Sequence, residues 1–235
     1  ATGDLVMNIG QHGLGVGRNV VLADNSFTFT CDQDNHSTPK TYPRPGQDPF
    51  AGQSIPITDV GQTLHTPTDA PYDAATGVVT FQINSHGFAN GDYIKIDDNS
   101  LVYTCVLDGN VVPKTYPRPG YDYPSGRWLE ISNVTANTFD VNIGPSSYTG
   151  AHTFVSAATN SIARQTGYIT INVGNGGSAS NSTHIFVSAT ANAVQHLPQS
   201  SHTFTGSTNN AVKHLPQSAH TFVRADANSL IVGGS

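Results

Sequence analysis

Tyrosine and arginine side chains recur around a proline-rich octet and have the clearest binding chemistry in this sequence. The octet PKTYPRPG occurs twice, at residues 39–46 and 113–120, letter for letter. Its prolines favour an extended backbone, so each copy predicts a stiff arm at the edge or the end of a sheet. Within the arm an arginine can lie on a tyrosine ring, or the same side chains can form a recognition ridge for a glycan or a neighbouring subunit. The residues concerned are Tyr42, Arg44, Tyr116 and Arg118.

Three further aromatic residues follow only the second octet. Tyr121, Tyr123 and Trp128 form a cluster that the first copy lacks. Aromatic rings can stack on sugars, so this cluster is a candidate ligand or subunit contact. For Trp128, which stands at the start of a predicted strand, a place in the core is the alternative.

Histidines recur at a fixed spacing in the C-terminal third. His184, His202 and His220 each begin a unit, and the units repeat every 18 residues. If three chains wound around one another, these imidazoles could form rings that bind a metal ion. The alternative is that each histidine is half exposed and bonds a neighbouring backbone carbonyl. We expect no metal and no cofactor, with these three histidines as the remaining metal candidates.

The carboxylates of the repeats are interpreted as turn formers. Asp34 and Asp108 head polar loops, and Asp48 and Asp122 could supply a second carboxylate on paper, but aspartate in such loops commonly bonds its own backbone. The sequence has no GxSxG motif and no activated Cys–His pair. We therefore expect the protein not to be an enzyme.

The two cysteines occupy equivalent positions in two copies of one repeat. Cys31 and Cys105 would lie a domain length apart, beyond the reach of a disulfide, so they are predicted to be buried free thiols. One free thiol in each copy fits assembly in a reducing cytoplasm.

Composition argues against two classes of partner. Charged residues make up 11% of the 235 residues, and the formal net charge is −6. Such a chain is poorly suited to binding nucleic acid or anionic membranes by electrostatic attraction. No run approaches the roughly 18 apolar residues of a membrane-spanning helix. We expect no nucleic-acid partner and no membrane insertion.

The octets belong to a longer repeat, because the sequence matches itself at an offset of 74 residues from residue 1 onward. Alternating apolar residues predict the same short strands in both copies, and no stretch has the 3.6-residue period of a helix. The predicted fold class is all-β, with two tandem small β modules at residues 1–66 and 67–145, the first shortened at its end. The predicted strands are residues 4–9, 19–22, 27–31 and 54–58, then 78–83, 93–96, 101–105, 128–132 and 138–144.

From about residue 146 the pattern changes to short β repeats. HIFVSATANAVQHLPQSS, HTFTGSTNNAVKHLPQSA and HTFVRADANSLIVGGS follow one another from residue 184, and an isolated copy, HTFVSAATNSIA, lies at 152–163. One such unit cannot bury its own apolar face, so copies are expected to stack on one another or on partner chains. Residues 146–235 are predicted to form an elongated array that associates with like chains, most simply as a homotrimer.

The first copy begins within the repeat. In the second copy the ATG turn at residues 75–77 follows APYDA, and the counterpart of APYDA would lie before Ala1. We expect another strand or module to precede it. This expectation suggests an extracellular filament subunit that adds a strand to its neighbour as one alternative role.

The motifs together resemble those of the repeat-rich virion structural proteins of tailed phages that infect marine cyanobacteria. In the first copy the resemblance lies in HGLGVG, DNSFTFTCDQDN, YPRPGQDP and AGQSIPIT. In the second it lies in SHGFANGDYIKIDDNS, TCVLDGN, YPRPGYDYPSG and TFDVNIG, and HTFVSA and HLPQSSHTF continue it towards the C-terminus. It covers nearly the whole chain and is specific as a combination. The chain departs from the pattern in the shortened end of the first copy and in Asp-Tyr-Pro at 122–124, where the first copy has Asp-Pro.

The resemblance implies a non-catalytic particle component, such as a fibre, decoration or appendage protein, assembled in the host cytoplasm and located in the virion. Its implied partners are like chains and other virion proteins. Two alternatives remain from the residues themselves. One is a carbohydrate-binding adhesin or tail-fibre module that uses Tyr116, Arg118, Tyr121 and Trp128; the other is the extracellular filament subunit.

Overall fold

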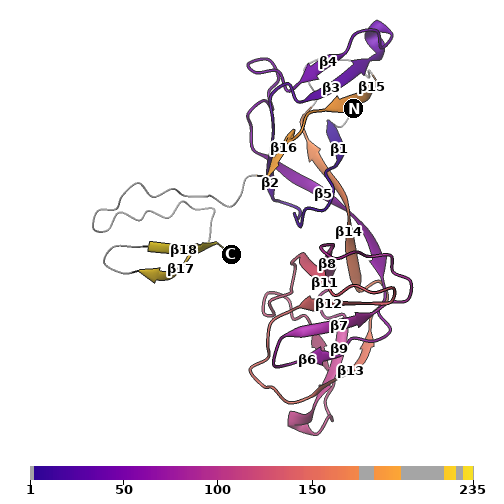
Figure 1. Ribbon diagram of the computed structural model, residues 1–235, viewed down its shortest axis with the longest axis vertical. Coiled ribbons are helices and arrows are strands. Elements are labelled where there is room, and N and C mark those ends of the chain that lie inside the picture. The colour runs from indigo at the N-terminus through magenta and orange to yellow at the C-terminus, as the bar shows by residue number, and fades with distance from the viewer. Residues whose placement is uncertain (1–2, 175–182, 197–219, 226–229, 235) are drawn as a thin grey trace.

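Short segments in which apolar and polar residues alternate form antiparallel strands. In β7, Val78–Gln82, the side chains of Val79 and Phe81 are fully buried, while Gln82 is exposed. The computed structural model describes residues 3–174, 183–196, 220–225 and 230–234 (Figure 1). Throughout these residues every strand pair is antiparallel, and the only helices are two single turns, η1 (Asp32–Asp34) and η2 (Val106–Asp108). The all-β prediction is confirmed.

The predicted strands lie where the alternation placed them. The first module has β1 (Asp4–Asn8), β2 (Asn19–Leu22), β3 (Phe27–Cys31), β4 (Lys40–Tyr42) and β5 (Ile55–His65). The second has β6 (Tyr72–Asp73), β7, β8 (Tyr93–Ile96), β9 (Leu101–Cys105), β10 (Lys114–Tyr116), β11 (Leu129–Ser132) and β12 (Thr138–Asn142). The main departure is β5, which continues to His65 although the alternation predicted an end at residue 58.

The two modules are joined by a long two-stranded ribbon of β5 and β14 (Ile162–Asn172). The register runs from His65↔Ile162 at one end to Ile57↔Ile171 at the other, and Figure 1 shows the two strands side by side between the modules. The start of β14 also pairs with β8 of the second module, and its end pairs with β1 of the first. The second module is therefore inserted within the first.

The pairing of the two modules makes this insertion explicit. In the second module β12 pairs with β7, with Asn142 opposite Val78. In the first module the end of β14 takes that place, with Asn172 opposite Asp4 of β1. Where the second module has a short turn between β11 and β12, the first has the whole second module. The expected tandem order of two consecutive modules is corrected accordingly.

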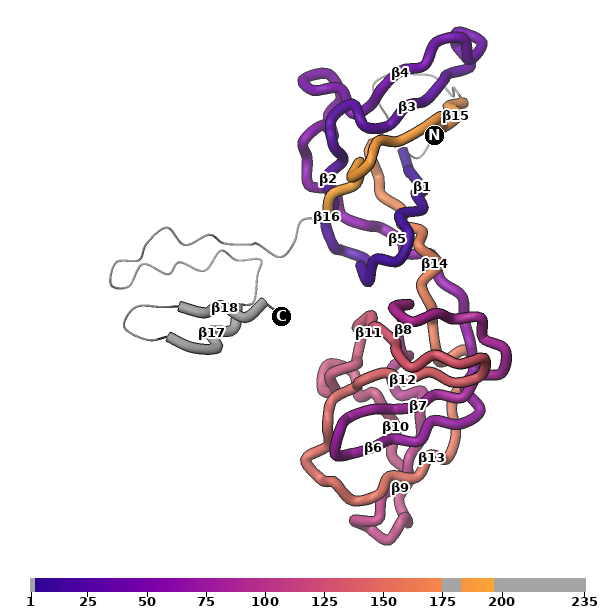
Figure 2. The backbone as a smooth tube through the Cα atoms, in the orientation of Figure 1, coloured from indigo at the N-terminus to yellow at the C-terminus, as the bar shows by residue number. Residues whose placement is uncertain are grey.

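The HTFVSA and HIFVSA repeats complete the modules. β13 (His152–Ala157) pairs with β9, and β15 (His184–Ala189) pairs with β3, each with a register shift after its phenylalanine. β16 (Val194–His196) pairs with β2. Figure 2 shows β15 running beside β3, although the two are far apart in the sequence. The prediction that these units stack on one another is wrong for residues 152–157 and 184–196, because they pair with the edges of β9, β3 and β2 instead.

Each module has its own core. Phe81, Phe139 and Ile94 are fully buried in the second cluster, while Ile57 and Ile169 are fully buried in the first. Since Ile169 belongs to β14, the first core depends on a strand that follows the second module.

Beyond the two modules, β17 (His220–Ala225) pairs with β18 (Leu230–Gly234). The unit that begins at His202 lies outside the described residues, so the array and the homotrimer stay predictions there. None of the described helices is long and apolar enough to cross a membrane.

Each proline octet begins as an edge strand. This position suits the prolines, because they have no N–H group to donate to a neighbouring strand. β4 and β10 are the terminal strands of their sheets, paired with β3 and β9 respectively. The bonds Tyr42–Pro43 and Tyr116–Pro117 are both cis. At the far ends of the partner strands, Cys31 and Cys105 are buried free thiols, as predicted.

Candidate functional site

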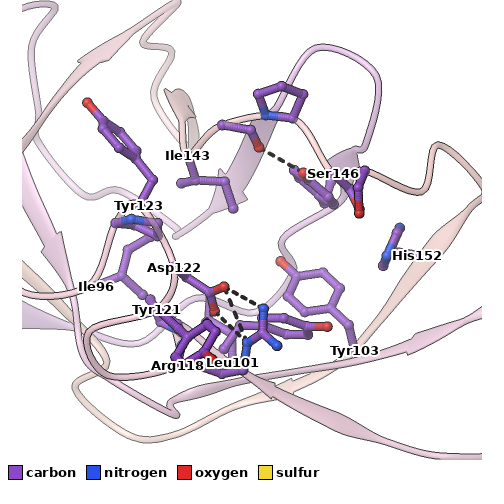
Figure 3. A pocket seen from close by; sticks show the side chains of 17 residues that line it. Ile96, Leu101, Tyr103, Arg118, Tyr121, Asp122, Tyr123, Ile143, Ser146 and His152 are labelled. Atoms are coloured by element: carbon purple, nitrogen blue, oxygen red, sulfur yellow. Dashed lines mark hydrogen bonds and ion pairs between the residues drawn. The ribbon is translucent and has the colours of Figure 1, made fainter. Parts of the chain in front are cut away.

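A cavity of about 340 Å³ lies beside the second octet, and most of the predicted contact residues line it (Figure 3). Tyr116 reaches it from the end of β10, and Arg118, Tyr121 and Tyr123 reach it from the turn that follows. The sequence therefore predicted the position of one wall of the cavity.

An arginine and an aspartate hold this wall in shape. The Arg118 backbone N–H and guanidinium both donate to the Asp122 carboxylate, at 2.6 Å and 2.7 Å. Burial opposes ionisation of Asp122, but the hydrogen bonds from Arg118 outweigh it and hold the pKa of Asp122 below its usual range. The guanidinium also lies over two rings, 5.4 Å from the centroid of Tyr116 and 5.6 Å from that of Tyr121. Asp122 therefore orients the cation and does not act as a free acid.

The outer rings are open to solvent. Tyr121 is 86% exposed and Tyr123 is 53% exposed. An aromatic ring that exposed contributes little to packing, so the part of each ring that no arginine covers remains available to a ligand. Arg127 lies over the Tyr123 ring at 4.9 Å and adds a second cation to this side.

The residues of the opposite wall were not predicted from the sequence. Tyr72 of β6, Tyr103 of β9 and His152 of β13 line it, and their rings contact one another at 6.5 Å and 5.5 Å. Tyr72 donates to the carbonyl of Gly144 at 2.8 Å, and Tyr103 donates to that of Ala70 at 2.7 Å. Burial raises the pKa of both phenols. The one signal in the sequence that pointed to this wall was the recurrence of HTFVSA, which begins at His152. The pairing of β13 with β9, which was not expected, brings this segment to the cavity.

His152 contributes a polar atom that is available for binding. Its Nδ1 is buried, and no hydrogen-bond partner for it exists among the described residues. A ligand hydroxyl that reached this atom would satisfy it.

Trp128 lies elsewhere. It does not line the cavity but is half-buried against the core of the first module, with Lys95 Nζ 5.3 Å from its ring centroid. Its neighbours Leu129 and Ile131 are nearly completely buried in the second core, and residues that alternate along a strand face opposite sides. The expected grouping of Trp128 with Tyr121 and Tyr123 is corrected; a packing role is observed instead.

The first octet has the same internal contacts and fewer aromatic neighbours. Arg44 lies 5.0 Å from the Tyr42 ring centroid and donates to Asp48 at 2.8 Å. Gln47 stands where the second copy has Tyr121, and Pro49 where it has Tyr123. Tyr42 and Arg44 are therefore occupied within the arm, without the exposed rings of the second copy.

The histidine candidates for a metal are not brought together in the part of the chain that the structure describes. His184 is exposed on β15, His220 belongs to β17, and His202 lies outside the described residues. Within the described residues there is no group of three or more side chains of the kinds that bind a metal ion.

The cavity combines tyrosine faces, hydroxyl groups and one oriented guanidinium. Such a surface suits the apolar faces and hydroxyl groups of a sugar, or an extended peptide with a polar end. No protein-family model, curated protein or solved structure matches this chain.

Proposed function

We propose that this chain is a non-catalytic structural component of a phage particle, a fibre, decoration or appendage protein that works with like chains and other virion proteins. Its repeated motifs support the proposal because their side chains are used in turns, strand edges and packing. The two octets form edge strands closed by Arg–Asp pairs, and the HTFVSA-type repeats pair with the cysteine-ended strands. The sequence resemblance to virion proteins of marine cyanophages is the reason for proposing that the protein belongs to a phage particle.

The finer architecture is part of this proposal. Repeats that continue through residues 197–235 would extend the protein beyond its two modules and supply contacts between chains, most simply in a trimer. Sedimentation of the full chain tests this part. We expect a species heavier than the 24.7 kDa monomer at micromolar concentration, and a monomer would contradict it.

The location is tested by finding the chain on purified particles. We expect an antibody raised against residues 66–165 to label virions from a density gradient in electron micrographs, and peptides of the chain to co-purify with capsid proteins. Its recovery only from the particle-free medium, as filaments, would contradict the virion and favour the extracellular alternative.

A second candidate function, carbohydrate binding, is favoured by the exposed rings at the cavity. Tyr121→Ala removes the most exposed ring while leaving the Arg118–Asp122 pair in place. We expect about a tenfold loss of affinity for any glycan that the wild-type chain binds on a glycan array, about 1.4 kcal/mol.

Gln47→Ala provides the matched control, because Gln47 holds the equivalent place in the first module and is also exposed. Its affinity should equal that of the wild type. A wild-type chain that binds no glycan, or equal losses in the two variants, would remove carbohydrate binding as a function of this cavity.

A further inference from the structure

The cavity beside the second octet has a buried deep end and an aromatic outer side. Leu101 and Tyr103 line it and are at most 5% exposed, so they close its deep end. Tyr121 and Tyr123 line it from the exposed side, across from His152 (Figure 3). Its volume of about 340 Å³ is near the lower limit of small-molecule sites, roughly 300–1,000 Å³. Such a cavity suits the end of a longer molecule whose remainder leaves across the outer rings.

The charges that line the cavity balance each other. Apart from His152, the lining residues with charged side chains are Arg118 and Asp122. Arg118 Nε and Nη2 both donate to the Asp122 carboxylate, at 3.2 Å and 2.7 Å. This edge of the guanidinium is the one that would bind a carboxylate or phosphate through two N–H groups, and it is already used. An acidic ligand would also meet the negative charge of Asp122. The electrostatics of the cavity therefore favour an uncharged occupant.

The polar atoms of the inner wall suit hydroxyl groups. His152 Nδ1 is buried without a hydrogen-bond partner among the described residues, and its ring contacts those of Tyr72 and Tyr148 at 5.5 Å and 6.3 Å. A hydroxyl group can donate or accept, so it satisfies Nδ1 in either tautomer of the ring, whereas a carboxylate can only accept. Ser146 Oγ accepts from the Tyr148 N–H at 3.1 Å, which leaves its own hydrogen to be donated to a ligand.

We propose that the cavity binds the terminal unit of an uncharged glycan, a neutral hexose that places a hydroxyl group on His152 Nδ1 while the next unit leaves across the ring of Tyr121. A sugar combines hydroxyl groups with apolar C–H faces, and these match the inner wall and the outer rings respectively. The inference rests on carbohydrate binding, the second candidate function, and adds the class of sugar and its orientation. In the first module Gln47 stands in the place of Tyr121, and His184, in the place of His152, is exposed.

Matched pairs of disaccharides test the preference for an uncharged sugar. The probes end in glucose, galactose or mannose, and each is compared with the form whose terminal C6 is oxidised to a carboxylate. Binding to the full chain is measured by isothermal titration calorimetry at pH 7. We expect at least one neutral probe to bind, and its oxidised form to bind at least tenfold more weakly. Equal or tighter binding of the oxidised form, or no binding of any neutral probe, would overturn the inference.

The salt dependence of binding gives a second readout on the same probes. A neutral sugar forms no ion pair, so its affinity should be the same in about 0.05 M and about 0.5 M NaCl. A tenfold fall in affinity over this range would show that charge holds the ligand and would contradict the proposal.

Variants of His152 test the orientation of the sugar. His152→Phe keeps a ring against Tyr72 but removes Nδ1, so we expect at least tenfold weaker binding of the neutral disaccharide and no fall in the urea midpoint. His152→Asn, whose amide can donate and accept, should bind more tightly than His152→Phe. His184→Phe is the matched control in the first module and should bind as the wild type does. Full affinity in His152→Phe would refute the orientation.

The outcomes separate this inference from the function on which it rests. If acidic glycans bind and Tyr121→Ala weakens that binding, carbohydrate binding stands and the neutral terminal sugar is refuted. If no glycan binds on the array, both fail, and the structural role proposed in the particle is unaffected.

Discussion

Asp92 shows how single side chains tie the two modules together. Its carboxylate is only 3% exposed and accepts from Arg164 Nε of β14 at 2.7 Å. It also accepts from the Ala89 N–H at 2.9 Å and from the side chain of Gln11, which belongs to the first module. Burial opposes ionisation of Asp92, but these hydrogen bonds outweigh it and hold the pKa of the carboxyl below its usual range. A buried carboxylate of this kind needs all its partners.

Arg164→Met tests this cluster. The variant keeps much of the side-chain volume but leaves Asp92 buried without its cation, which should cost about 3 kcal/mol of unfolding free energy at pH 7. Because the folded-state pKa of Asp92 is lowered, its contribution is present above about pH 4 and is lost as the pH falls below that value. The difference in unfolding free energy between wild type and variant, measured by urea unfolding, should therefore be smaller at pH 3 than at pH 7.

Arg127→Met is the control for that experiment. Arg127 is exposed and lies over the ring of Tyr123, so its replacement should change the unfolding free energy by less than about 0.5 kcal/mol at either pH. A difference for Arg164→Met that stays constant with pH would contradict the role given to Asp92.

Contacts of the candidate site were predictable only where they are local in sequence. Tyr116, Arg118, Tyr121 and Tyr123 meet because the octet and the turn after it place them together. His152 reaches the cavity through the pairing of β13 with β9, and nothing in the spacing of the repeats specifies that partner. The grouping of Trp128 with Tyr121 and Tyr123 was wrong. Trp128 directly precedes Leu129, whose side chain faces the second core, so the Trp128 ring faces the first module.

At the scale of elements, the ATG turn sets how closely β7 approaches β12. Gly77 has φ +80°, and its N–H donates to the Asp73 carbonyl at 2.8 Å. A Cβ on Gly77 would lie 2.2 Å from the carbonyl carbon of Gly144, which follows the end of β12 by two residues. Gly3 meets Gly174 in the same way in the first module, at 2.6 Å. The repeated glycines are therefore required by backbone contact.

Gly77→Ala should destabilise the protein well beyond the cost of its positive φ. Gly87→Ala is the matched control, since Gly87 has φ +69° with no atom within 4 Å of an added Cβ. We expect Gly87→Ala to cost about 1 kcal/mol, and Gly77→Ala at least twice as much, because its backbone neighbour must move. Equal changes in urea midpoints would show that the contact with Gly144 has no energetic weight.

Strand positions were predictable from alternation, whereas strand partners were not. The alternation in VVTFQ and YIKI specifies which side chains face a core, and β7 and β8 formed there. A period of two carries no information on which edge a strand joins, so the alternation predicts a strand at HTFVSA but not its pairing with β9. The regular spacing from His184 onward favoured stacking, but the open edge of β3 lies much earlier in the sequence.

At the scale of the whole molecule, insertion of the second module in the first has unequal consequences for the two. The first module depends on strands that follow the second module, whereas the second module does not depend on strands of the first in this way. The second module draws its strands from a continuous stretch, β6 to the start of β14. The first draws β1 to β5 from before that stretch and the rest of β14, β15 and β16 from after it. Removal of the inserted stretch should therefore leave the first module complete, provided that the ribbon of β5 and β14 remains closed.

A deletion and a truncation distinguish this arrangement from tandem modules. In the deletion, residues 66–161 are replaced by Asn-Gly, which joins His65 directly to its partner Ile162 as a two-residue hairpin. In the truncation, the chain ends at residue 150, which keeps both modules as the repeats define them but removes β13 to β18. Tandem modules would survive the truncation and lose the long strand pairing in the deletion. Inserted modules require the reverse. The deletion variant should show strand-type circular dichroism and a cooperative urea transition. In the truncation variant the first module should show no cooperative urea transition, because Ile169 and Ile171 no longer fill its core.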